Sequence, residues 1–302
     1  MLNDLMLAYH FAAELTAPRH EYERRPEPAL IMDGVDNVRE FRDAGRVDGS
    51  VAPVYLFNML LLCHAIKPGD TVIDLGCGPA NLLIELALLN PGARFIGVDL
   101  SREMLRLASD LRDSSNAENV TFIHADITKN IGMATGAADV VMSTLSLHHL
   151  PEQRLLEDCC VEAARLLRQG GQIHLMDFGG LKRVATTEYF ARERTAGLTP
   201  FLAEDYRNSI YAAYRLDDLR TLTRHFDTAS PGARAVSTLG VPFLMALTSL
   251  QSAAMPPKPQ QMRLRDYWQG MQQQQKKDFD AMRLFFKLSG LSVPHPKGFA
   301  VA

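Results

Sequence analysis

Short apolar runs alternate with longer amphipathic runs through the middle of the chain. Five apolar runs, rich in β-branched residues, predict strands at 71–75, 94–100, 120–126, 138–145 and 172–178. Between them, apolar residues recur with helical spacing and Pro or Gly marks the ends, which predicts helices within 81–90, 101–113 and 151–171. This alternation predicts an α/β fold with a parallel sheet and helices on both of its faces.

The N-terminal part is more polar and is broken by Pro and Gly up to about position 50. A first amphipathic helix is predicted by the helical spacing of Leu2, Leu5, Met6, Tyr9 and Ala13. The run 53–66 predicts a mostly buried helix with Pro53 in its first turn.

The pattern changes after Gly180. Residues 181–226 are predicted to be largely helical with a break at 197–200, and the runs 233–240 and 241–250 predict an antiparallel pair at the sheet edge. A Pro-rich linker then leads to one predicted helix over 261–289, whose glutamine-rich middle forms a solvated face. Its apolar stripe is expected to dock on its own domain or to bury a homodimer contact, and consists of Trp268, Met271, Met282, Phe285 and Phe286.

Composition places the chain among soluble globular proteins. Its 302 residues are 47% hydrophobic and 22% charged, with a formal net charge of −3, so no basic surface suggests nucleic acid or a membrane as partner. The four cysteines show no metal-ligand spacing, and no metal site is expected. Because the first residues lack a basic segment and no apolar run reaches about 20 residues, we expect neither a signal peptide nor a membrane span, and a cytoplasmic location.

The segment "VIDLGCGPAN" combines a strand, a glycine turn and the start of a helix. Gly76 and Gly78 allow the backbone to approach a ligand closely, but no Gly-Lys-Ser/Thr follows, so a P-loop is excluded. Asp99, at the end of the next strand, is placed to hold ribose hydroxyls. Asp74 would repel a pyrophosphate and attract a cation, which favours S-adenosylmethionine over a dinucleotide.

Four segments then occur in order at the strand ends: "VIDLGCGPAN", "FIGVDLSREMLRLA", "VTFIHADI" and "ADVVMSTLSLHHLP". They resemble the motifs of the class I S-adenosylmethionine-dependent methyltransferases over roughly residues 60–180. The resemblance implies a Rossmann-like, doubly wound, seven-stranded sheet whose last strand is antiparallel. We therefore expect a helical N-terminal lid over 1–58, a catalytic domain over 59–250 and a C-terminal helical extension over 251–302.

The resemblance also implies roles for individual residues. Asp74, Gly76, Cys77 and Gly78 would face the methionine part of the cofactor, while Asp99 and Leu100 would contact its ribose and adenine. Asp126 would reach the adenine amino group, Ile127 would pack on the ring, and Ser143 and Thr144 would line the reactive end. Ala80 replaces the usual third glycine, which is expected to matter little.

Residues around this core are candidates for the chemistry and for the substrate pocket. His148 or His149 is a candidate base, which a hydroxyl or carbon acceptor would need. Asp177 closes the fifth predicted strand at the same edge, and Tyr55 resembles an aromatic residue that closes over the cofactor. One face of the following helix is expected to contribute Tyr206, Ser209 or Ile210, and Tyr214.

The expected reaction is methyl transfer to a small molecule, a metabolite or a natural-product intermediate. A peptide or protein acceptor is the alternative within the same fold, and nucleic acid is not expected because no basic element is present. Two alternatives of other classes are an NAD-dependent oxidoreductase and a non-catalytic scaffold that binds the cofactor.

Overall fold

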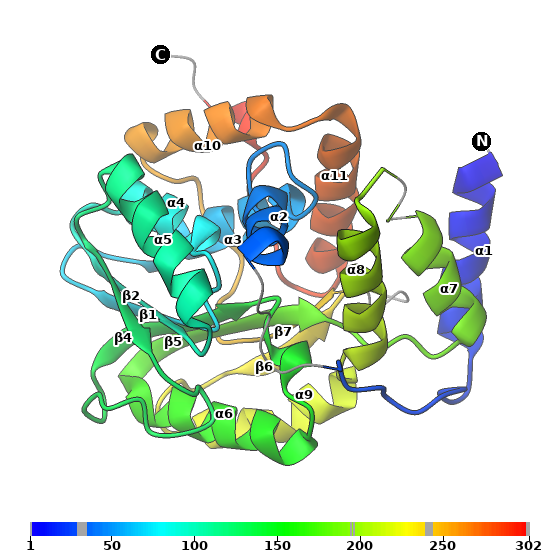
Figure 1. The fold of residues 1–302 in the computed structure, drawn as a ribbon, viewed down its shortest axis with the longest axis horizontal. Helices are drawn as coiled ribbons and strands as arrows, with labels where there is room; N and C mark the ends of the chain where they lie inside the picture. Colours follow the sequence, from blue (N-terminus) through cyan, green and yellow to red (C-terminus); the bar gives the residue numbers. More distant parts are fainter. Residues whose placement is uncertain (1, 29–34, 194, 196, 239–243, 300–302) are drawn as a thin grey trace.

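A seven-stranded sheet forms the centre of the computed structural model, which describes residues 2–28, 35–193, 195, 197–238 and 244–299. The strand order is β3-β2-β1-β4-β5-β7-β6 (Figure 1). The strands are β1 (Thr71–Leu75), β2 (Arg94–Asp99), β3 (Val120–His124), β4 (Ala138–Thr144), β5 (Leu167–Phe178), β6 (Arg234–Ser237) and β7 (Leu244–Thr248). β7 is antiparallel to both of its neighbours, whereas β1 to β5 are parallel, as the sequence predicts.

Helices cover both faces of this sheet and bury alternate residues of each strand. On one face, Val72 and Phe95 pack with α3 (Ala52–Ala65), α4 (Asn81–Leu89) and α5 (Arg102–Ser115). On the other, Ile73 and Val98 pack with α6 (Gln153–Leu166) and α9 (Leu216–Leu222). Because both faces of the sheet are buried, the sequences of its central strands are nearly continuous apolar runs.

The order of the strands places a crevice at the carboxyl ends of β1 and β4. β1 pairs with β2 on one side and with β4 on the other, so the direction of the crossover connections reverses between them. The strand register aligns Asp74 with Met142 of β4, and Thr144 with Met176 of β5. The polar residues that end these strands are thereby brought to one edge of the sheet.

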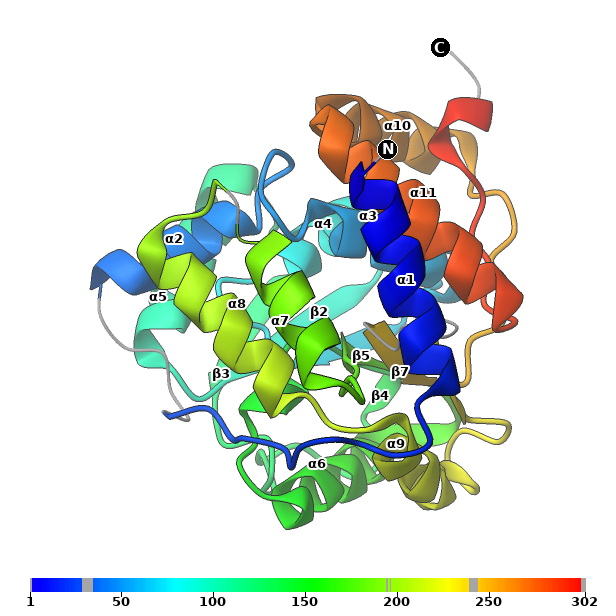
Figure 2. The same cartoon turned by 90° about the vertical axis from the view of Figure 1, so that its right-hand side faces the viewer.

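A second group of helices is contributed by segments on both sides of the core sequence. It contains α1 (Leu2–Thr16), α7 (Val184–Glu193) and α8 (Pro200–Ala212), drawn on the right of Figure 1, and α2 (Val35–Ala44), drawn in its middle. Residues 17–28, which we call the strap, run from the end of α1 past α8 without regular structure (Figure 2). The break between α7 and α8 is where the sequence predicts it.

The first helix is confirmed, but it buries a different side from the apolar one expected. Leu5 and Tyr9 are exposed, whereas His10 and Glu14 are buried. The Glu14 carboxylate accepts hydrogen bonds from the amides of Lys182 and Arg183 just before α7. Polar contacts therefore dock α1, because a carboxylate at a helix N-terminus is favoured by the free amides there.

The prediction of one long C-terminal helix over 261–289 is wrong. The structure has two helices, α10 (Lys258–Gly270) and α11 (Gln273–Leu288). Gln272 begins α11 with a capping box, in which its side chain and that of Gln275 bond each other's backbone amides. Gln275 is buried and also donates to the carbonyl of Gly49, whereas Gln272, Gln273 and Gln274 are exposed, so the expected solvated face is confirmed except at Gln275.

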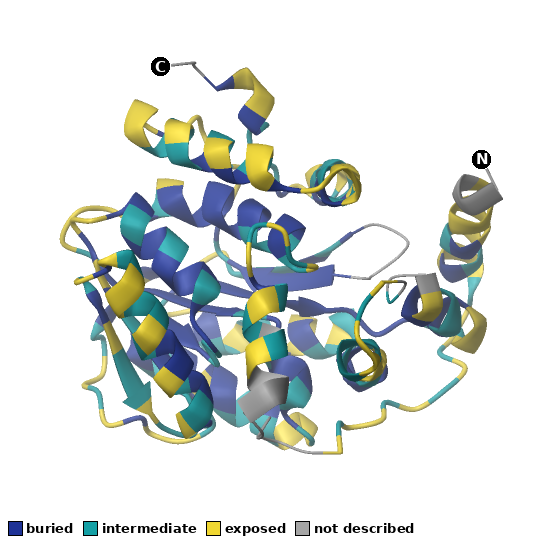
Figure 3. Ribbon diagram, turned by 45° about the horizontal axis from the view of Figure 1, so that its top comes forward, coloured by how far each residue is buried: buried dark blue, intermediate teal, exposed yellow. Residues whose placement is uncertain are grey.

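The apolar stripe of these helices packs within the chain. Phe286 is fully buried and stacks on Phe57 of α3 with 4.9 Å between ring centroids, and Met271 and Met282 are buried beside it. Figure 3 shows the yellow, solvent-facing side of α10 and α11 opposite this buried side. A homodimer through α11 would have to use its exposed positions, Leu284 and Leu288.

Two boundaries differ from expectation in detail. β5 begins at Leu167, directly after α6, so the glycines at 170 and 171 lie inside the strand and not in a loop. The expected lid boundary after residue 58 falls within α3, whose buried residues belong to the main core. Of the second edge run, 241–243 lies outside the described residues.

Within the described ranges, none of the helices combines the length and the apolar character that crossing a membrane requires.

The docking of α11 on α3 yields a prediction about stability. Phe286→Ala should lower the free energy of unfolding by about 3–5 kcal/mol, because it leaves a cavity against Phe57. Leu288→Ala, at a position that is 60% exposed on the same helix, is the matched control and should change it by less than about 0.5 kcal/mol. Urea unfolding followed by circular dichroism measures both, and equal effects would contradict this packing.

Candidate functional site

The glycine turn after β1 brings the backbone close to the loop after β4. Gly76 has a φ of +73°, and a Cβ there would lie 2.3 Å from Ser146 Oγ. Gly78 is also in the left-handed region, as is Ala80, with a φ of 61°. Ala80 therefore matters more than expected, because a non-glycine residue in this conformation costs roughly 1–2 kcal/mol.

A cleft of about 350 Å³ opens beside this turn. It is lined by the residues expected to contact the cofactor at three strand ends, namely Gly76, Gly78, Asp99, Leu100, Asp126 and Ile127. His149 and Leu150 close it from the loop after β4. A larger and more open cavity of about 670 Å³ lies between the strap, α7 and α8, and its lining contains none of these motif residues among the described ones. The smaller cleft is therefore the candidate site.

Asp99 links the glycine turn to α5. Its two carboxylate oxygens accept hydrogen bonds from the amides of Gly78 and Ser101, each at 2.8 Å. Burial raises the pKa of Asp99, and these amide hydrogen bonds oppose the rise. Ser101 in turn caps α5, because its hydroxyl accepts a hydrogen bond from the amide of Met104. The Asp99 carboxylate is thus held rigidly at the edge of the cleft.

Asp74 is a buried acid without a full set of partners. Its side chain is at the end of β1, and Oδ1 has no hydrogen-bond partner among the described residues. Burial raises its pKa to about 8, and the charge of Asp99 adds to the rise. Tyr55, which is partly buried, lies nearby: burial raises the pKa of its hydroxyl, and the charge of Asp74 adds to the rise. Such a carboxylate fits a cationic ligand group, which would supply the missing partner.

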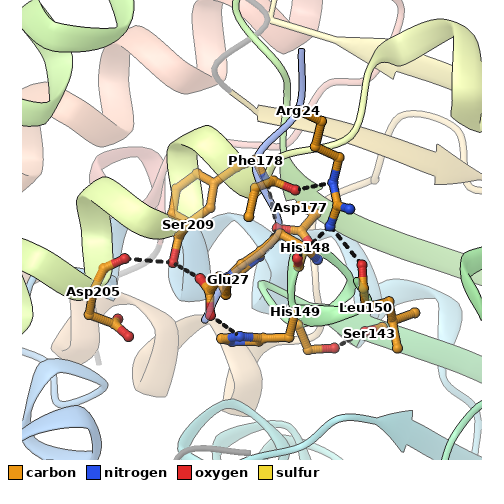
Figure 4. Close-up of polar contacts among 12 residues, drawn as sticks. Arg24, Glu27, Ser143, His148, His149, Leu150, Asp177, Phe178, Asp205 and Ser209 are labelled. Carbon is orange, nitrogen blue, oxygen red and sulfur yellow. Dashed lines mark hydrogen bonds and ion pairs between the residues drawn. The ribbon is translucent and has the colours of Figure 1, made fainter. Parts of the chain in front are cut away.

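A buried cluster of acids and imidazoles lies next to the cleft (Figure 4). His148 Nδ1 lies 2.6 Å from Asp177 Oδ1, and His149 Nδ1 lies 2.5 Å from Glu27 Oε2. Glu27 Oε1 accepts from the Ser209 hydroxyl at 2.8 Å and lies 3.7 Å from His148 Nε2. Because His149 also lines the cleft, the cluster and the cleft form one continuous site.

Electrostatics hold this cluster together. Burial alone would lower the pKa of His148, but the carboxylates of Asp177 and Glu27 raise it above its usual value. Burial would likewise raise the pKa of Glu27, but the hydrogen bond from His149 and the nearby imidazoles lower it. Asp205 of α8, also labelled in Figure 4, has its pKa raised to about 6 by burial and by the charge of Glu27.

The strap brings Glu27 into this cluster and is itself held by Arg24. The Arg24 guanidinium donates to four backbone carbonyls, those of His148, Leu150, Pro151 and Ala212, and lies 3.8 Å from the ring centroid of Tyr214. Arg24 thus ties the strap to the loop after β4 and to the end of α8. Four of its five N–H donors are used in this way, and three of the four acceptors are carbonyls of that loop.

Other expected site residues lie outside the cleft. Ser143 is buried and donates to the carbonyl of Leu75, and Thr144 Oγ1 is buried without a partner among the described residues. Cys77 packs over Gly97, where a Cβ would lie 2.7 Å from its Sγ, and burial raises the pKa of its thiol. Their contacts with the cofactor stay predictions.

The expected substrate face of α8 is only partly assembled. Tyr206 packs edge-on against Phe178 at 5.7 Å, beside the cluster. Ile210 packs instead with Leu181 and Phe190 in a separate apolar cluster, and Tyr214 lies beyond the end of α8, where its hydroxyl donates to Leu150. The placement of Ile210 and Tyr214 on one pocket-facing helical surface is therefore wrong, because α8 ends at Ala212.

Sequence reasoning missed Arg24, Glu27 and Asp205. Glu27 meets His149 across 122 positions of sequence, within a polar segment that has no periodicity. The only local signal was the dense charge of "RRPEP", which is equally typical of a solvated loop.

Comparisons with known proteins agree with this geometry. Residues 66–199 match the family model described as a methyltransferase domain. The ubiquinone biosynthesis O-methyltransferase of Paraburkholderia xenovorans is 31% identical over 166 residues, which cover 52% of this chain and 68% of that protein. The 27-O-demethylrifamycin SV methyltransferase of Amycolatopsis mediterranei is 30% identical over 162 residues, covering 46% of this chain and 58% of that protein.

Other relatives are named for other acceptors, among them ribosomal RNA and arsenite. The chain spans less than two thirds of the length of several of these curated relatives, between 28% and 65%. The fold also matches the crystal structure of an S-adenosylmethionine-dependent methyltransferase from Aquifex aeolicus, with a TM-score of 0.51 at 15% identity, over 72% of this chain and 99% of that one.

The similarity in sequence and the similarity in fold lead to the same conclusion. The chain belongs to the class I S-adenosylmethionine-dependent methyltransferases, and S-adenosylmethionine is its cofactor.

Proposed function

We propose that the chain transfers the methyl group of S-adenosylmethionine to a hydroxyl group of a small molecule, such as a metabolite or a natural-product intermediate. The observation that carries this proposal is the buried cluster of Glu27, His148 and His149, which shares His149 with the cofactor cleft. Relatives named as O-methyltransferases of ubiquinone biosynthesis and of rifamycin SV support an oxygen acceptor.

Residues that line the cleft, together with Asp74 and Thr144 at the neighbouring strand ends, would hold the cofactor along its length. Asp74 would bind its cationic methionine end, and Asp99 would bind its ribose hydroxyls. Asp126 and Ile127 would contact the adenine, and Thr144, whose hydroxyl is a buried polar group without a described partner, would lie near the reactive end. When bound, S-adenosylmethionine supplies an electrophilic methyl carbon, which forms a bond to the acceptor's oxygen as the carbon–sulfur electron pair returns to sulfur.

The cluster would activate the acceptor. A neutral hydroxyl is a poor nucleophile, so its proton has to leave as the new bond forms. Asp177 and Glu27 orient the two imidazoles at the edge of the cleft, and the buried setting strengthens their electrostatic effect. Holding acceptor and methyl group in line would supply much of the remaining acceleration.

The unusual ionisation of Asp74 predicts how stability depends on pH. Its pKa is about 8 in the folded chain and about 4 when unfolded. Between these values the folded chain holds a proton that the unfolded chain has released, so the free energy of unfolding falls as pH rises from 4 to 8 and then levels off. Asp74→Asn removes this titration, so without cofactor its melting temperature should exceed that of wild type increasingly up to pH 8.

The same variant should bind the cofactor more weakly. Losing the charge that pairs with a buried cationic group should reduce affinity for S-adenosylmethionine by about 10–100-fold at pH 8. Asp110→Asn, at an exposed position of α5, is the control and should change neither property. Thermal melts from pH 5 to 9 and calorimetry measure both effects, and melting curves that keep a constant offset across pH would contradict the buried, unpaired state of Asp74.

The proposed reaction is tested by incubating the full chain with S-adenosylmethionine and a panel of small hydroxyl compounds, peptides and ribosomal RNA fragments. We expect methylation of a small hydroxyl compound, measured by mass spectrometry, and a kcat lower by about 10²–10⁴-fold in Glu27→Gln. His295→Gln is the control, because His295 pairs with Asp280 outside the site. Methylation of peptides or RNA alone would contradict the proposal.

A further inference from the structure

Three side chains of the acid–histidine cluster converge on one point. One ligand atom of each of Glu27, His148 and His149 lies within 4.8 Å of the other two. The three residues come from two separate segments, the strap and the loop after β4, which Arg24 ties together. In Figure 4 the Glu27 carboxylate points toward the imidazole of His149, and His148 lies beside them.

The orientation of His148 is that of a prepared metal ligand. The Asp177 carboxylate is hydrogen-bonded to His148 Nδ1 at 2.6 Å and to the backbone amide of His148 at 2.9 Å. His148 Nε2 therefore faces Glu27 Oε1, which lies 3.7 Å away. Metal-binding imidazoles commonly have a carboxylate on the far nitrogen, because it fixes the ring and makes the ligating nitrogen more basic. The Ser209 hydroxyl similarly holds the Glu27 carboxylate.

The charge around this point favours a cation. The side chains of Glu27, His148 and Asp177 are 7%, 3% and 2% exposed, and the partly buried Asp205 is near enough to interact electrostatically with both imidazoles. The carboxylates of Glu27 and Asp177 therefore place negative charge where water solvates it poorly.

The kinds of ligand atom indicate which cation fits. Two imidazole nitrogens with one carboxylate suit divalent first-row transition metals such as Zn²⁺, Fe²⁺ or Co²⁺, and not Mg²⁺ or Ca²⁺, which prefer oxygen. For metal–ligand distances of about 2.0–2.2 Å, the Glu27–His149 hydrogen bond of 2.5 Å has to open so that both side chains face the ion. Three protein ligands also leave a position open, as in catalytic sites.

We propose that Glu27, His148 and His149 bind one divalent transition-metal ion beside the cofactor cleft, and that this ion binds the acceptor's oxygen. The second part rests on the function proposed above. The metal lowers the pKa of the bound hydroxyl, whose proton is released to solvent, and the remaining oxygen lone pair attacks the methyl carbon. In this arrangement the imidazoles serve as ligands, and the metal takes over the activation expected of a histidine base.

Metal binding is tested first without any reaction. Co²⁺ is titrated into the metal-stripped full chain and followed by its visible absorption, with Zn²⁺ as competitor. We expect one equivalent to bind wild type and His295→Gln alike, and binding at least about tenfold weaker in Glu27→Gln and Asp177→Asn. Asp177→Asn should weaken Co²⁺ binding less than Glu27→Gln does, because Asp177 only orients His148 whereas Glu27 binds the metal itself. Thermal melts check that all variants are folded.

The outcomes separate this inference from the proposed function. No saturable binding to wild type, or equal affinity in wild type and Glu27→Gln, would overturn the metal site even if methyl transfer is observed. Full methyl transfer by the metal-stripped chain in the presence of a chelator would overturn the activating role of the ion. Stoichiometric Co²⁺ binding together with transfer that requires the metal supports both parts.

Discussion

The carboxylate of Asp177 connects the parts on which the site depends. It accepts hydrogen bonds from the amide and imidazole of His148 and from the amide of Phe178, at 2.9, 2.6 and 2.6 Å. This joins the end of β5 to the loop after β4, and Arg24 fixes the other side of that loop through its carbonyls. Asp177 and Arg24 together fix the positions of the imidazoles, of Glu27 and of the cleft. Hydrogen bonds to charged groups away from water are strong, so they allow little displacement.

Much of the fold and the cofactor half of the site could be predicted from the sequence. Strand and helix periodicities are local, and the carboxyl ends of parallel strands must meet at one edge, so Asp74, Asp99 and Asp126 could be brought together without coordinates. The choice of a cationic cofactor also followed from charge alone. The structure adds that Asp74 is buried and that its Oδ1 has no hydrogen-bond partner among the described residues. Its raised pKa means that this acid destabilises the fold above about pH 4.

The other half of the site could not be predicted, since it is made by contacts that leave no local pattern. Glu27 lies in an irregular strap, and its partner His149 is 122 positions away. The same limit explains the first helix, where buried His10 and Glu14 find distant polar partners while an apolar side faces solvent. The helix break at Gln272 was missed for another reason: Gln is rarely a helix cap, and here a buried contact to Gly49 supports it.

A crystal structure of the chain with bound S-adenosylhomocysteine would show whether one site places the cofactor's reactive end beside the cluster of Glu27, His148 and His149. We expect the amino group of the ligand within about 3 Å of the Asp74 carboxylate, and its sulfur turned toward these three side chains. A ligand whose amino group lies away from Asp74, or whose adenine and not its sulfur faces the cluster, would contradict this expectation.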